Sequence, residues 1–288
     1  MLYIENYSAD RGIMTKERLD KILAHHGFGT RKDVKRLCHQ SAVTVNGKVV
    51  TDPGAKIDID NDILQIDGEE IKLQRDLYIM LNKCKDVVCA SKDGEHQTVF
   101  DLLDEGLRHK FLGGDLHCMG RLDIDTEGLL ILTTDGKLTH RLLAPKTHVP
   151  KTYAVGLRDQ LTEGQKKEYI EKFSKGFWID REQNEEGFDC QSGELIFIDE
   201  SGESRIEKSL LSAATKNSSG TVDCFLTIYE GKFHQVKRMF AQMGNEVVYL
   251  KRVKMGDLVL DNKIELGSYR ELWEEEIELL AGNVPEKE

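Results

Sequence analysis

The 288-residue sequence lacks several features that would assign it to membrane, secreted or nucleotide-dependent proteins. No apolar run approaches the roughly eighteen residues of a membrane-spanning helix. Residues 1–11 are polar and mixed in charge, unlike a secretory signal. There is no internal repeat and no glycine-rich nucleotide loop, which argues against ATP or NAD chemistry. We therefore expect a cytoplasmic protein with no membrane partner.

Metal-ligand spacing is also lacking. The cysteines form no Cys-x-x-Cys pair and no cluster with histidine, so no metal site is expected from them. Buried free thiols in a reducing cytoplasm are the interpretation that we favour. This interpretation covers all six cysteines, Cys38, Cys84, Cys89, Cys118, Cys190 and Cys224.

The charge that is present is unevenly distributed. The chain is 39% hydrophobic and 32% charged, as in soluble globular proteins, and its net charge is -11. Yet residues 14–50 contain eight Lys/Arg against three Asp/Glu, and residues 230–255 contain six against two. Two basic faces on an acidic body could bind a polyanion, whereas the rest of the surface would repel it.

The amino-terminal part predicts a small basic module. Residues 1–13 show no periodicity and are expected to be a flexible extension. Apolar spacing from Arg18 predicts a short helix ending at Gly27 or Gly29, and a capping box of Thr30 with Asp33 predicts a second helix through about Gln40. Residues 43–50 alternate around Asn-Gly, which predicts a hairpin. We expect phosphate contacts within this module, residues 14–72, from basic side chains at Arg18, Arg31, Lys32, Lys35, Arg36 and Lys48.

After a charged linker at residues 73–76, the remainder of the chain predicts a second domain, residues 77–288. Strands are expected at residues 77–83, 129–132, 153–155, 222–229 and 247–253. Helices are expected from Asp135 as a cap through Leu143, at residues 162–176, and from Val236 onward. The acidic stretch at 180–208 is interpreted as an insertion or long loop, and the insertion itself is placed near residues 182–207.

One loop carries most of the chemical interest. Residues 120–128, Gly-Arg-Leu-Asp-Ile-Asp-Thr-Glu-Gly, precede the apolar strand 129–132, so an acid with an arginine neighbour would stand at the mouth of a buried strand. Asp123, Asp125 and Glu127 also fit the first positions of a calcium loop, but Thr134 stands at the twelfth position instead of glutamate. A merely solvated turn is the other alternative. Of the three acids only Asp123 is expected to have a chemical role, and Asp125 and Glu127 are expected at the solvated surface of the loop.

Three ordered stretches resemble the RsuA-type pseudouridine synthases: Gly120-Arg121-Leu122-Asp123 with Thr126 and Gly128-Leu129, then Lys151-Thr152-Tyr153, then residues 231–240, Gly-Lys-Phe-His-Gln-Val-Lys-Arg-Met-Phe. Residues 16–68 resemble the RNA-binding domain named after small-subunit ribosomal protein four. Together the resemblance covers about residues 16–280. The sequence departs from the family at Cys84-Lys85, where Pro-Gly is usual, and near residues 211–214, where a proline is missing.

The resemblance implies an isomerase that converts uridine to pseudouridine in small-subunit (16S) ribosomal RNA, without cofactor or metal. Asp123 would attack covalently or remove a ribose proton, and the alternatives stay open. Lys237 would pair with Asp123, with Arg238 as second choice, and Tyr153 would stack on the uracil and assist proton removal. Arg121 would fill the gap left by a flipped nucleotide, and Leu250 would form an apolar wall. Further substrate contacts are expected from the adjoining motif residues Leu122, His234 and Gln235.

The fold class that follows is α+β. A small helix-helix-hairpin RNA-binding domain would precede a catalytic domain with a mixed, largely antiparallel sheet and a central cleft, the sheet topology being implied by the resemblance. We expect a monomer whose partner is ribosomal RNA, either naked or in an assembling subunit. The alternatives are a synthase acting on large-subunit ribosomal RNA and a non-catalytic RNA-binding or ribosome-assembly factor.

Overall fold

The computed structural model describes residues 16–25, 28–40, 42–59, 61–71, 76–105, 107, 116–182, 185–198, 206–215 and 220–282. These residues form two units, one within residues 16–71 and one from residue 76 onward. The expected extension at 1–13 and the linker residues 73–75 lie outside the described residues. Within the described ranges, no helix is both long and apolar enough to cross a membrane.

The smaller unit contains two helices and short strands. They are β1 (Lys16–Arg18), α1 (Leu19–His25), α2 (Arg31–His39), β2 (Val43–Val45), β3 (Lys48–Val49), β4 (Lys56–Asp58), β5 (Leu64–Ile66) and β6 (Glu69–Ile71). Strands β3, β2, β5 and β6 form one sheet, and β1 pairs with β4. The capping box predicted at Thr30 and Asp33 is present, and the predicted hairpin joins β2 to β3. Asn46 and Gly47 turn this hairpin with φ of 50° and 75°, as a two-residue turn requires.

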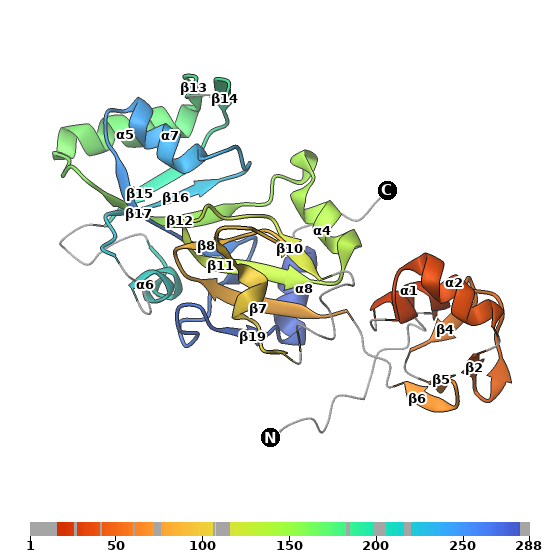
Figure 1. The fold of residues 1–288 in the computed structure, drawn as a ribbon. Coiled ribbons are helices and arrows are strands. Elements are labelled where there is room, and N and C mark those ends of the chain that lie inside the picture. The colour runs from red at the N-terminus through yellow and green to blue at the C-terminus, as the bar shows by residue number, and fades with distance from the viewer. Residues whose placement is uncertain are drawn as a thin grey trace. The chain divides into compact units, whose positions relative to one another are not determined.

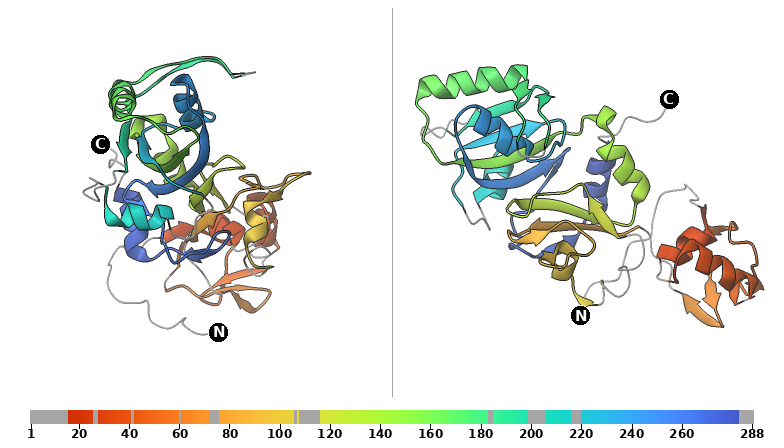
Figure 2. Two further views of the ribbon diagram at one scale, coloured as in Figure 1. Left: turned by 90° about the vertical axis from the view of Figure 1, so that its left-hand side faces the viewer. Right: turned by 45° about the horizontal axis from the view of Figure 1, so that its top comes forward.

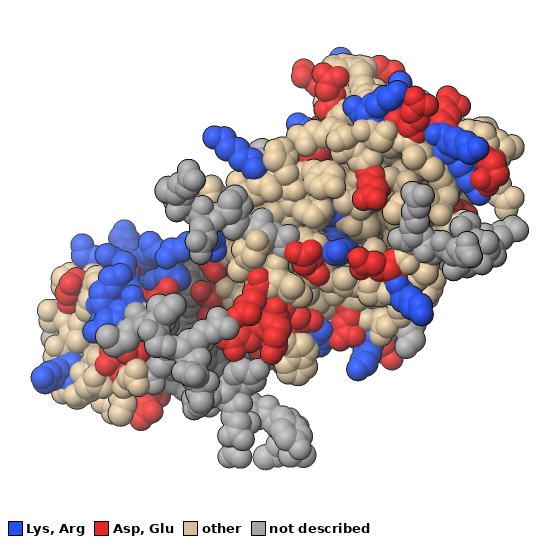
Figure 3. Space-filling model, turned by 180° about the vertical axis from the view of Figure 1, so that it is seen from behind, with Lys and Arg blue, Asp and Glu red and all other residues tan. Residues whose placement is uncertain are grey.

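The helices of the smaller unit bury one face and expose the other. Val34 and Cys38 are fully buried in a core that also contains Leu19, Leu23 and Leu64. The opposite face of α2 is exposed and basic, with charged side chains at Arg31, Lys32, Lys35 and Arg36. Figure 3 shows Lys and Arg side chains gathered on one face of this unit. Burial of the apolar stripe therefore fixes which way the basic face points.

The larger unit is built on one sheet with helices against it. Its strands are β7 (Tyr78–Lys83), β8 (Val87–Val88), β9 (Gln97–Thr98), β10 (His117–Met119), β11 (Glu127–Thr133), β12 (Lys151–Leu157), β13 (Phe177–Ile179), β14 (Phe188–Cys190), β15 (Glu194–Phe197), β16 (Cys224–Ile228), β17 (Val247–Met255), β18 (Leu258–Val259) and β19 (Tyr269–Glu271). Its helices are η1 (Val99–Leu102), α4 (Gly136–Leu143), η2 (Pro145–Thr147), α5 (Glu163–Lys175), α6 (Lys208–Thr215), α7 (Gln235–Gln242) and α8 (Glu274–Gly282).

The main sheet has the strand order β15-β16-β12-β17-β11-β7-β19, with β10 added to β11 and β18 to β17 (Figure 1). All of these pairings are antiparallel except β11 with β17, which is parallel over Glu127–Lys251 and Gly128–Arg252. The expectation of an α+β protein with a mixed, largely antiparallel sheet is confirmed. The parallel contact matters because it brings the end of the 120–128 loop next to β17.

Strand β11 lies between β7 and β17 and is buried along its whole length. Leu129, Leu130, Ile131 and Leu132 are all 0% exposed, as expected for an apolar run with sheet neighbours on both sides. Leu129 and Ile131 belong to a core that also takes in residues of α4, α6 and α8. The loop before β11 is therefore anchored to the most buried strand of the unit.

Helices α5 and α7 pack on each other through aromatic rings. Phe240 of α7 lies 5.0 Å from Phe173 and 6.1 Å from Tyr169 of α5, measured between ring centroids. Figures 1 and 2 show these two helices together at the β15–β16 end of the sheet, with α4 and α8 together away from them. Both helices were predicted from sequence, and the structure adds a capping box of Thr162 with Gln165 at the start of α5. Their packing fixes the direction of α7, whose first turn faces the cleft described below.

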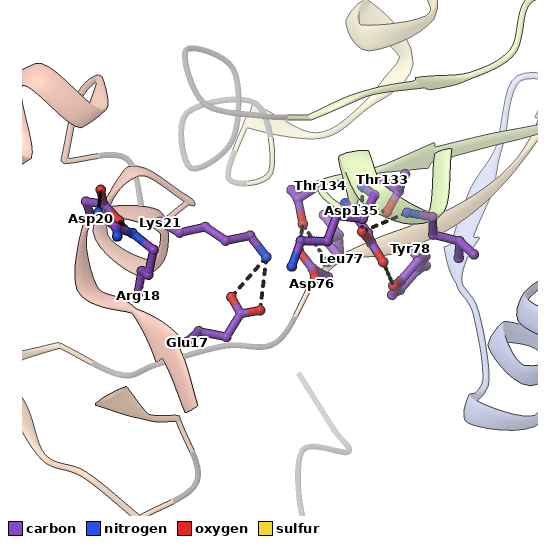
Figure 4. Close-up of polar contacts among 12 residues, drawn as sticks. Glu17, Arg18, Asp20, Lys21, Asp76, Leu77, Tyr78, Thr133, Thr134 and Asp135 are labelled. Atoms are coloured by element: carbon purple, nitrogen blue, oxygen red, sulfur yellow. Dashed lines mark hydrogen bonds and ion pairs between the residues drawn. The ribbon is translucent and has the colours of Figure 1, made fainter. Parts of the chain in front are cut away.

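The start of β7 is tied to the end of β11 by side-chain hydrogen bonds (Figure 4). Leu77 donates its backbone N–H to Thr134 Oγ1 at 3.0 Å, and Thr134 Oγ1 donates to Asp76. Tyr78 donates its hydroxyl to Asp135, which also caps α4 through the N–H groups of Lys137 and Leu138. Burial, followed by the charge and hydrogen bond of Asp135, raises the pKa of Tyr78. Thr134 and Asp135 thus have a structural role: they end β11, hold the start of β7 and, through Asp135, cap α4.

The acidic stretch at 180–208 was interpreted as an insertion or long loop, and the loop interpretation is wrong for its described middle part. Residues 188–190 form β14, which pairs with β13, and residues 194–197 form β15, an edge strand of the main sheet paired with β16. Leu195 and Cys190 are buried there. Short strands of three and four residues, with acidic residues on both sides, are too brief for their alternation to be seen against the charge of the segment.

Candidate functional site

A cleft of about 900 Å³ opens in the larger unit. Its walls come from the 120–124 segment of the loop, from the start of β12, from β17, and from residues 228–236 between β16 and α7. All the parts lie on elements of one sheet or on loops that adjoin it. Residues more than one hundred positions apart in the sequence therefore meet at this cleft.

The loop at 120–128 is held from below by Lys83, the last residue of β7. This side chain is 0% exposed, and its ammonium donates to backbone carbonyls of the loop at Asp123 (3.0 Å), Ile124 (3.2 Å) and Thr126 (3.0 Å), and to Cys84 O (3.0 Å). Burial lowers the pKa of Lys83 below that of an ordinary lysine. The carbonyl oxygens thus compensate a buried cation, and the cation fixes the loop backbone.

Gly128 ends the loop at a place where only glycine fits. Its φ is 99°, a left-handed value, and a Cβ atom there would lie 2.2 Å from the backbone oxygen of Arg252. The parallel pairing of Gly128 with Arg252 requires this close approach. The glycine of the motif is thereby explained by packing and does not require a bound ion.

Asp123 points toward the first turn of α7. Its Oδ2 atom lies 3.1 Å from Nζ of Lys237, and its Oδ1 atom lies 3.9 Å from Nε2 of His234. Lys237 also donates to Asp125. Burial alone would raise the pKa of Asp125, but the hydrogen bond and charge of Lys237 outweigh it and lower that pKa. One ammonium therefore bridges two carboxylates of the loop, and the side chain of Asp123 stays 28% exposed at the cleft.

The residues before α7 are fixed by a second set of hydrogen bonds. Gln235 is 3% exposed; its Nε2 donates to Glu230 at 2.7 Å and its Oε1 accepts from the N–H of Lys232 at 3.0 Å. His234 adopts a left-handed conformation, φ 47°, where it leads into the helix. These contacts define the wall of the cleft opposite the loop, and they place Lys237 within reach of Asp123.

The other side chains expected at the site also line the cleft. Tyr153 is 8% exposed and lies in register with Arg252 on the neighbouring strand. Leu250 is 5% exposed and Leu122 is 7% exposed. Arg121, in the 120–124 segment of the cleft wall, is exposed to solvent. The structure thus brings together Arg121, Leu122, Asp123, Tyr153, His234, Gln235 and Leu250 as cleft residues, with Lys237 bound to Asp123 behind them.

Arg238 does not reach the cleft, contrary to its prediction as a substrate contact. It is 5% exposed, donates to the carbonyls of Asp180 (2.8 Å) and Glu186 (2.9 Å), and lies over the ring of Phe188. One residue further along a helix rotates a side chain by about 100°, and this turn separates Arg238 from Lys237. Its role is to hold the β13–β14 hairpin against α7.

Glu127 had been expected at the solvated surface of the loop, and this expectation is also wrong. It is 1% exposed, accepts a hydrogen bond from the Tyr249 hydroxyl at 2.8 Å, and lies in register with Lys251. Burial lowers the pKa of Lys251 to about 8, and the charge of Glu127 opposes that shift. Because Glu127 points into the sheet, it is turned away from any ion that Asp123 and Asp125 could share. Among the described residues, no group of three or more His, Cys, Asp or Glu is placed to hold a metal ion.

Three basic residues of the site were missed from sequence. Lys83 was predicted only as the end of a strand, Lys151 only as part of a motif, and Arg252 only as one position of the expected strand 247–253. Arg252 is 2% exposed, donates from Nε to Leu129 O at 2.8 Å, and its buried Nη2 has no hydrogen-bond partner within the described residues. Burial, followed by the charge of Arg252, lowers the pKa of Lys151 to about 8. A charged residue inside an apolar strand pattern was the available signal.

Cys89 and Cys118 also lie in the wall of the cleft, whereas buried thiols had been expected for all six cysteines. Cys38, Cys190 and Cys224 are buried, but Cys84, Cys89 and Cys118 are partly exposed. Cys89 accepts the backbone N–H of Leu122 at 3.4 Å. A hydrogen bond from Cys118, then this N–H and the charges of Lys83 and Arg252, lower the pKa of Cys89, whereas the pKa of Cys118 is raised. Cys89 therefore also supports the loop, through the backbone N–H of Leu122.

In the smaller unit, the expected RNA contacts are all exposed side chains. Arg31, Lys32, Lys35, Arg36 and Lys48 face solvent. Arg36 pairs with Asp33 on its own helix. Arg18, also exposed, forms a bidentate pair with Asp20 at 2.9 and 2.8 Å (Figure 4), and this pairing lowers the pKa of Asp20. Arg18 and Arg36 are therefore partly engaged within their own unit.

Comparison with known proteins agrees with this geometry. Residues 77–242 match the family model described as RNA pseudouridylate synthase, and residues 17–64 match the S4 domain. An RNA pseudouridine synthase of Bacillus subtilis, YtzG, described as uncharacterized, is 40% identical over 91% of this chain and 98% of its own. Ribosomal small subunit pseudouridine synthase A of Haemophilus influenzae is 37% identical over 92% and 99%.

A solved structure gives the same result. The crystal structure of a pseudouridylate synthase is 35% identical, covers 92% of this chain and 99% of that chain, and superposes with a TM-score of 0.56. The identity exceeds 30% over nearly the whole length in sequence and in structure. Since the loop, the β12 tyrosine and the start of α7 meet in one cleft, the conclusion is that this chain belongs to the RNA pseudouridylate synthase family, whose members are isomerases that convert uridine in RNA to pseudouridine.

Proposed function

We propose that this enzyme isomerises a specific uridine of small-subunit ribosomal RNA. Relatives named ribosomal small subunit pseudouridine synthase A match over 90% or more of this chain at 37–38% identity. The S4 domain at 17–64 carries the exposed basic face of α2, which suits a phosphate backbone. We further expect the enzyme to act as a monomer in the cytoplasm, on naked RNA or on an assembling subunit.

The observation that carries this proposal is the contact of Asp123 with Lys237 in a cleft that also holds Tyr153. The isomerisation breaks the N-glycosidic bond of uridine, turns the uracil, and rejoins it to the ribose through carbon five. A carboxylate must be ionised to attack carbon or to remove a ribose proton, and the ammonium of Lys237 lies 3.1 Å from the carboxylate of Asp123. Asp123 takes this role.

The remaining cleft residues receive roles from their placement. Tyr153 offers its ring to the uracil and its hydroxyl to the proton that leaves carbon five. Leu250 forms an apolar wall beside it. Arg121 is exposed at the entrance, where a flipped nucleotide leaves a gap in the RNA that a guanidinium can fill. Leu122, His234 and Gln235 shape the walls between these groups.

Pseudouridine mapping of small-subunit ribosomal RNA tests the proposal. Unmodified RNA, naked or in a reconstituted subunit, is incubated with the enzyme, and each new pseudouridine is located. We expect one modified position with wild type and none above background with Asp123→Asn. Asp125→Asn is the matched control. It removes the other carboxylate that pairs with Lys237, and this carboxylate points away from the proposed chemistry. The variant should therefore retain most of the activity.

Lys237 variants separate charge from shape. Lys237→Arg keeps the cation beside Asp123 and should retain activity within about ten-fold, whereas Lys237→Met should lose on the order of a hundred-fold in kcat. Undiminished product with Asp123→Asn would overturn the proposed mechanism. Pseudouridine in large-subunit RNA alone would leave the chemistry intact and overturn the proposed substrate.

A further inference from the structure

Two aromatic rings stand exposed at the rim of the cleft. Phe233 is 50% exposed and Tyr229 is 37% exposed, and both line the cleft. The other exposed large rings in the described residues, Trp178 and Trp273, do not line it. Leaving an apolar ring half in water gives up the stabilisation of burial. A ring in this state beside an active site is suited to a partner that is absent from the free protein.

The segment that carries the two rings is rigidly held. Gln235 bonds Glu230 and the backbone of Lys232, so the turn between Tyr229 and His234 is closed from both sides. The ring of Phe233 stacks on the ring of His234, with centroids 3.8 Å apart and planes 23° apart. One face of Phe233 is therefore covered by His234, and the exposed half of the side chain faces outward from that stack.

The stack leads directly to the reacting group. His234 lies between Phe233 and Asp123, with its Nε2 atom 3.9 Å from the Asp123 carboxylate. A base that stacked on the outer face of Phe233 would thus stand two side chains away from the carboxylate. For a target uridine bound at Asp123, the neighbouring bases of the RNA would lie near this stack.

The chemistry of the substrate supplies the missing partner. Flipping a nucleotide out of the helix deprives its neighbours of a stacking contact, and unpaired bases stack on aromatic side chains in RNA-binding proteins. We propose that Phe233, with Tyr229 beside it on the same turn, is a stacking platform for the unpaired base adjacent to the target uridine. The proposal rests on the protein acting on RNA, and it adds a substrate subsite outside the uridine pocket.

Fluorescence of 2-aminopurine tests stacking without requiring catalysis. The base is placed next to a uridine, both in an oligouridylate and in the small-subunit RNA fragment that becomes modified. Stacking on a protein ring quenches its emission. We expect quenching with wild type and with Phe233→Tyr, and loss of quenching with Phe233→Ala. Trp273→Ala is the control, because it removes an exposed ring outside the cleft and should leave the quenching unchanged.

An abasic substitution distinguishes stacking from support of His234. Phe233→Ala should raise KM on the order of ten-fold, with kcat changed less. Removing the neighbouring base should raise KM similarly in wild type and have little further effect in Phe233→Ala. Equal, additive losses in both proteins, or quenching that survives Phe233→Ala, would overturn the platform. Absent pseudouridine with intact quenching would instead count against the proposed function and leave the platform standing.

Discussion

Both units concentrate positive charge, but they hold it in different ways. On α2 of the smaller unit, Arg31, Lys32 and Lys35 project into solvent from a helix whose other face is buried. At the site of the larger unit, Lys83 lies beneath the loop and Arg252 lines the cleft; both are no more than 2% exposed and donate to backbone carbonyls. Exposed cations can contact a phosphate backbone, and salt weakens these contacts. Buried cations are fixed in position when the chain folds.

The difference suggests a division of labour. Charges on α2 would contribute affinity that is shared by many RNA sequences, and their individual positions matter little. Charges in the cleft determine the positions of the loop and of Asp123, and small displacements there change the rate. The two regions should therefore respond to mutation in opposite ways, the first in affinity and the second in kcat.

The largest expected effect comes from Lys83→Met. This change leaves four backbone carbonyls without their shared donor, so we expect the free energy of unfolding to fall by about 3 kcal/mol or more. The backbone of Asp123 would also lose its anchor, and kcat should fall on the order of a hundred-fold. Denaturant unfolding and single-turnover pseudouridine formation measure the two losses separately.

Lys251→Met is the matched control for this prediction. Lys251 is also 0% exposed, but it is in register with Glu127, whose charge acts on it, whereas Lys83 bonds the loop carbonyls of Asp123 and Ile124. We expect a comparable loss of stability with a much smaller loss of kcat in the folded fraction. If both variants lost kcat equally, Lys83 would have no special role in positioning Asp123, and the comparison of the two regions would be weaker.

The next effect is expected on α2. Replacing the four basic residues of its exposed face by glutamine should weaken RNA binding and reduce the slope of log K against log salt by up to about 3. At saturating RNA, kcat should remain near the wild-type value. Binding titrations at several salt concentrations, followed by single-turnover rates, check both parts. The four residues are Arg31, Lys32, Lys35 and Arg36.

Helix α5 supplies an equal change of charge elsewhere. Its four lysines, Lys166, Lys167, Lys172 and Lys175, also lie on a surface helix, and two of them pair with glutamates of the same helix. The same replacement there changes net charge by the same amount and should reduce the salt slope far less. Equal slopes for the two quadruple variants would show that the α2 face has no particular contact with RNA.

The sequence predicted much of this arrangement because local signals were strong. The capping box at Thr30, the Asn46-Gly47 turn and the apolar run 129–132 each determine one element by short-range chemistry. The motif residues Asp123 and Lys237 were expected together, and the structure places them 3.1 Å apart. Their catalytic roles stay predictions.

The parts that were not predicted depend on contacts across the sheet. Lys83 and Arg252 are separated from the loop they support by about forty residues and more, and no local pattern reveals a carbonyl acceptor. Arg238 was misplaced because a helix turns its neighbour out of the site. The strands at 188–197 were missed because pairing with β16 and β13, and not propensity, stabilises them.

The smallest expected effect concerns Lys151, which combines features of both regions. It lines the cleft, and burial with the charge of Arg252 lowers its pKa to about 8, against about 10.4 for a lysine in water. Its charge is therefore present below pH 8 and lost as pH rises through that value. If Lys151 contacts an RNA phosphate, kcat/KM should fall a few-fold between about pH 7 and pH 9, because a phosphate contact requires the charged form. Lys151→Arg keeps its charge and should abolish the fall, whereas the same exchange at exposed Lys146 should not; a fall that persists in Lys151→Arg would assign the titration to another group.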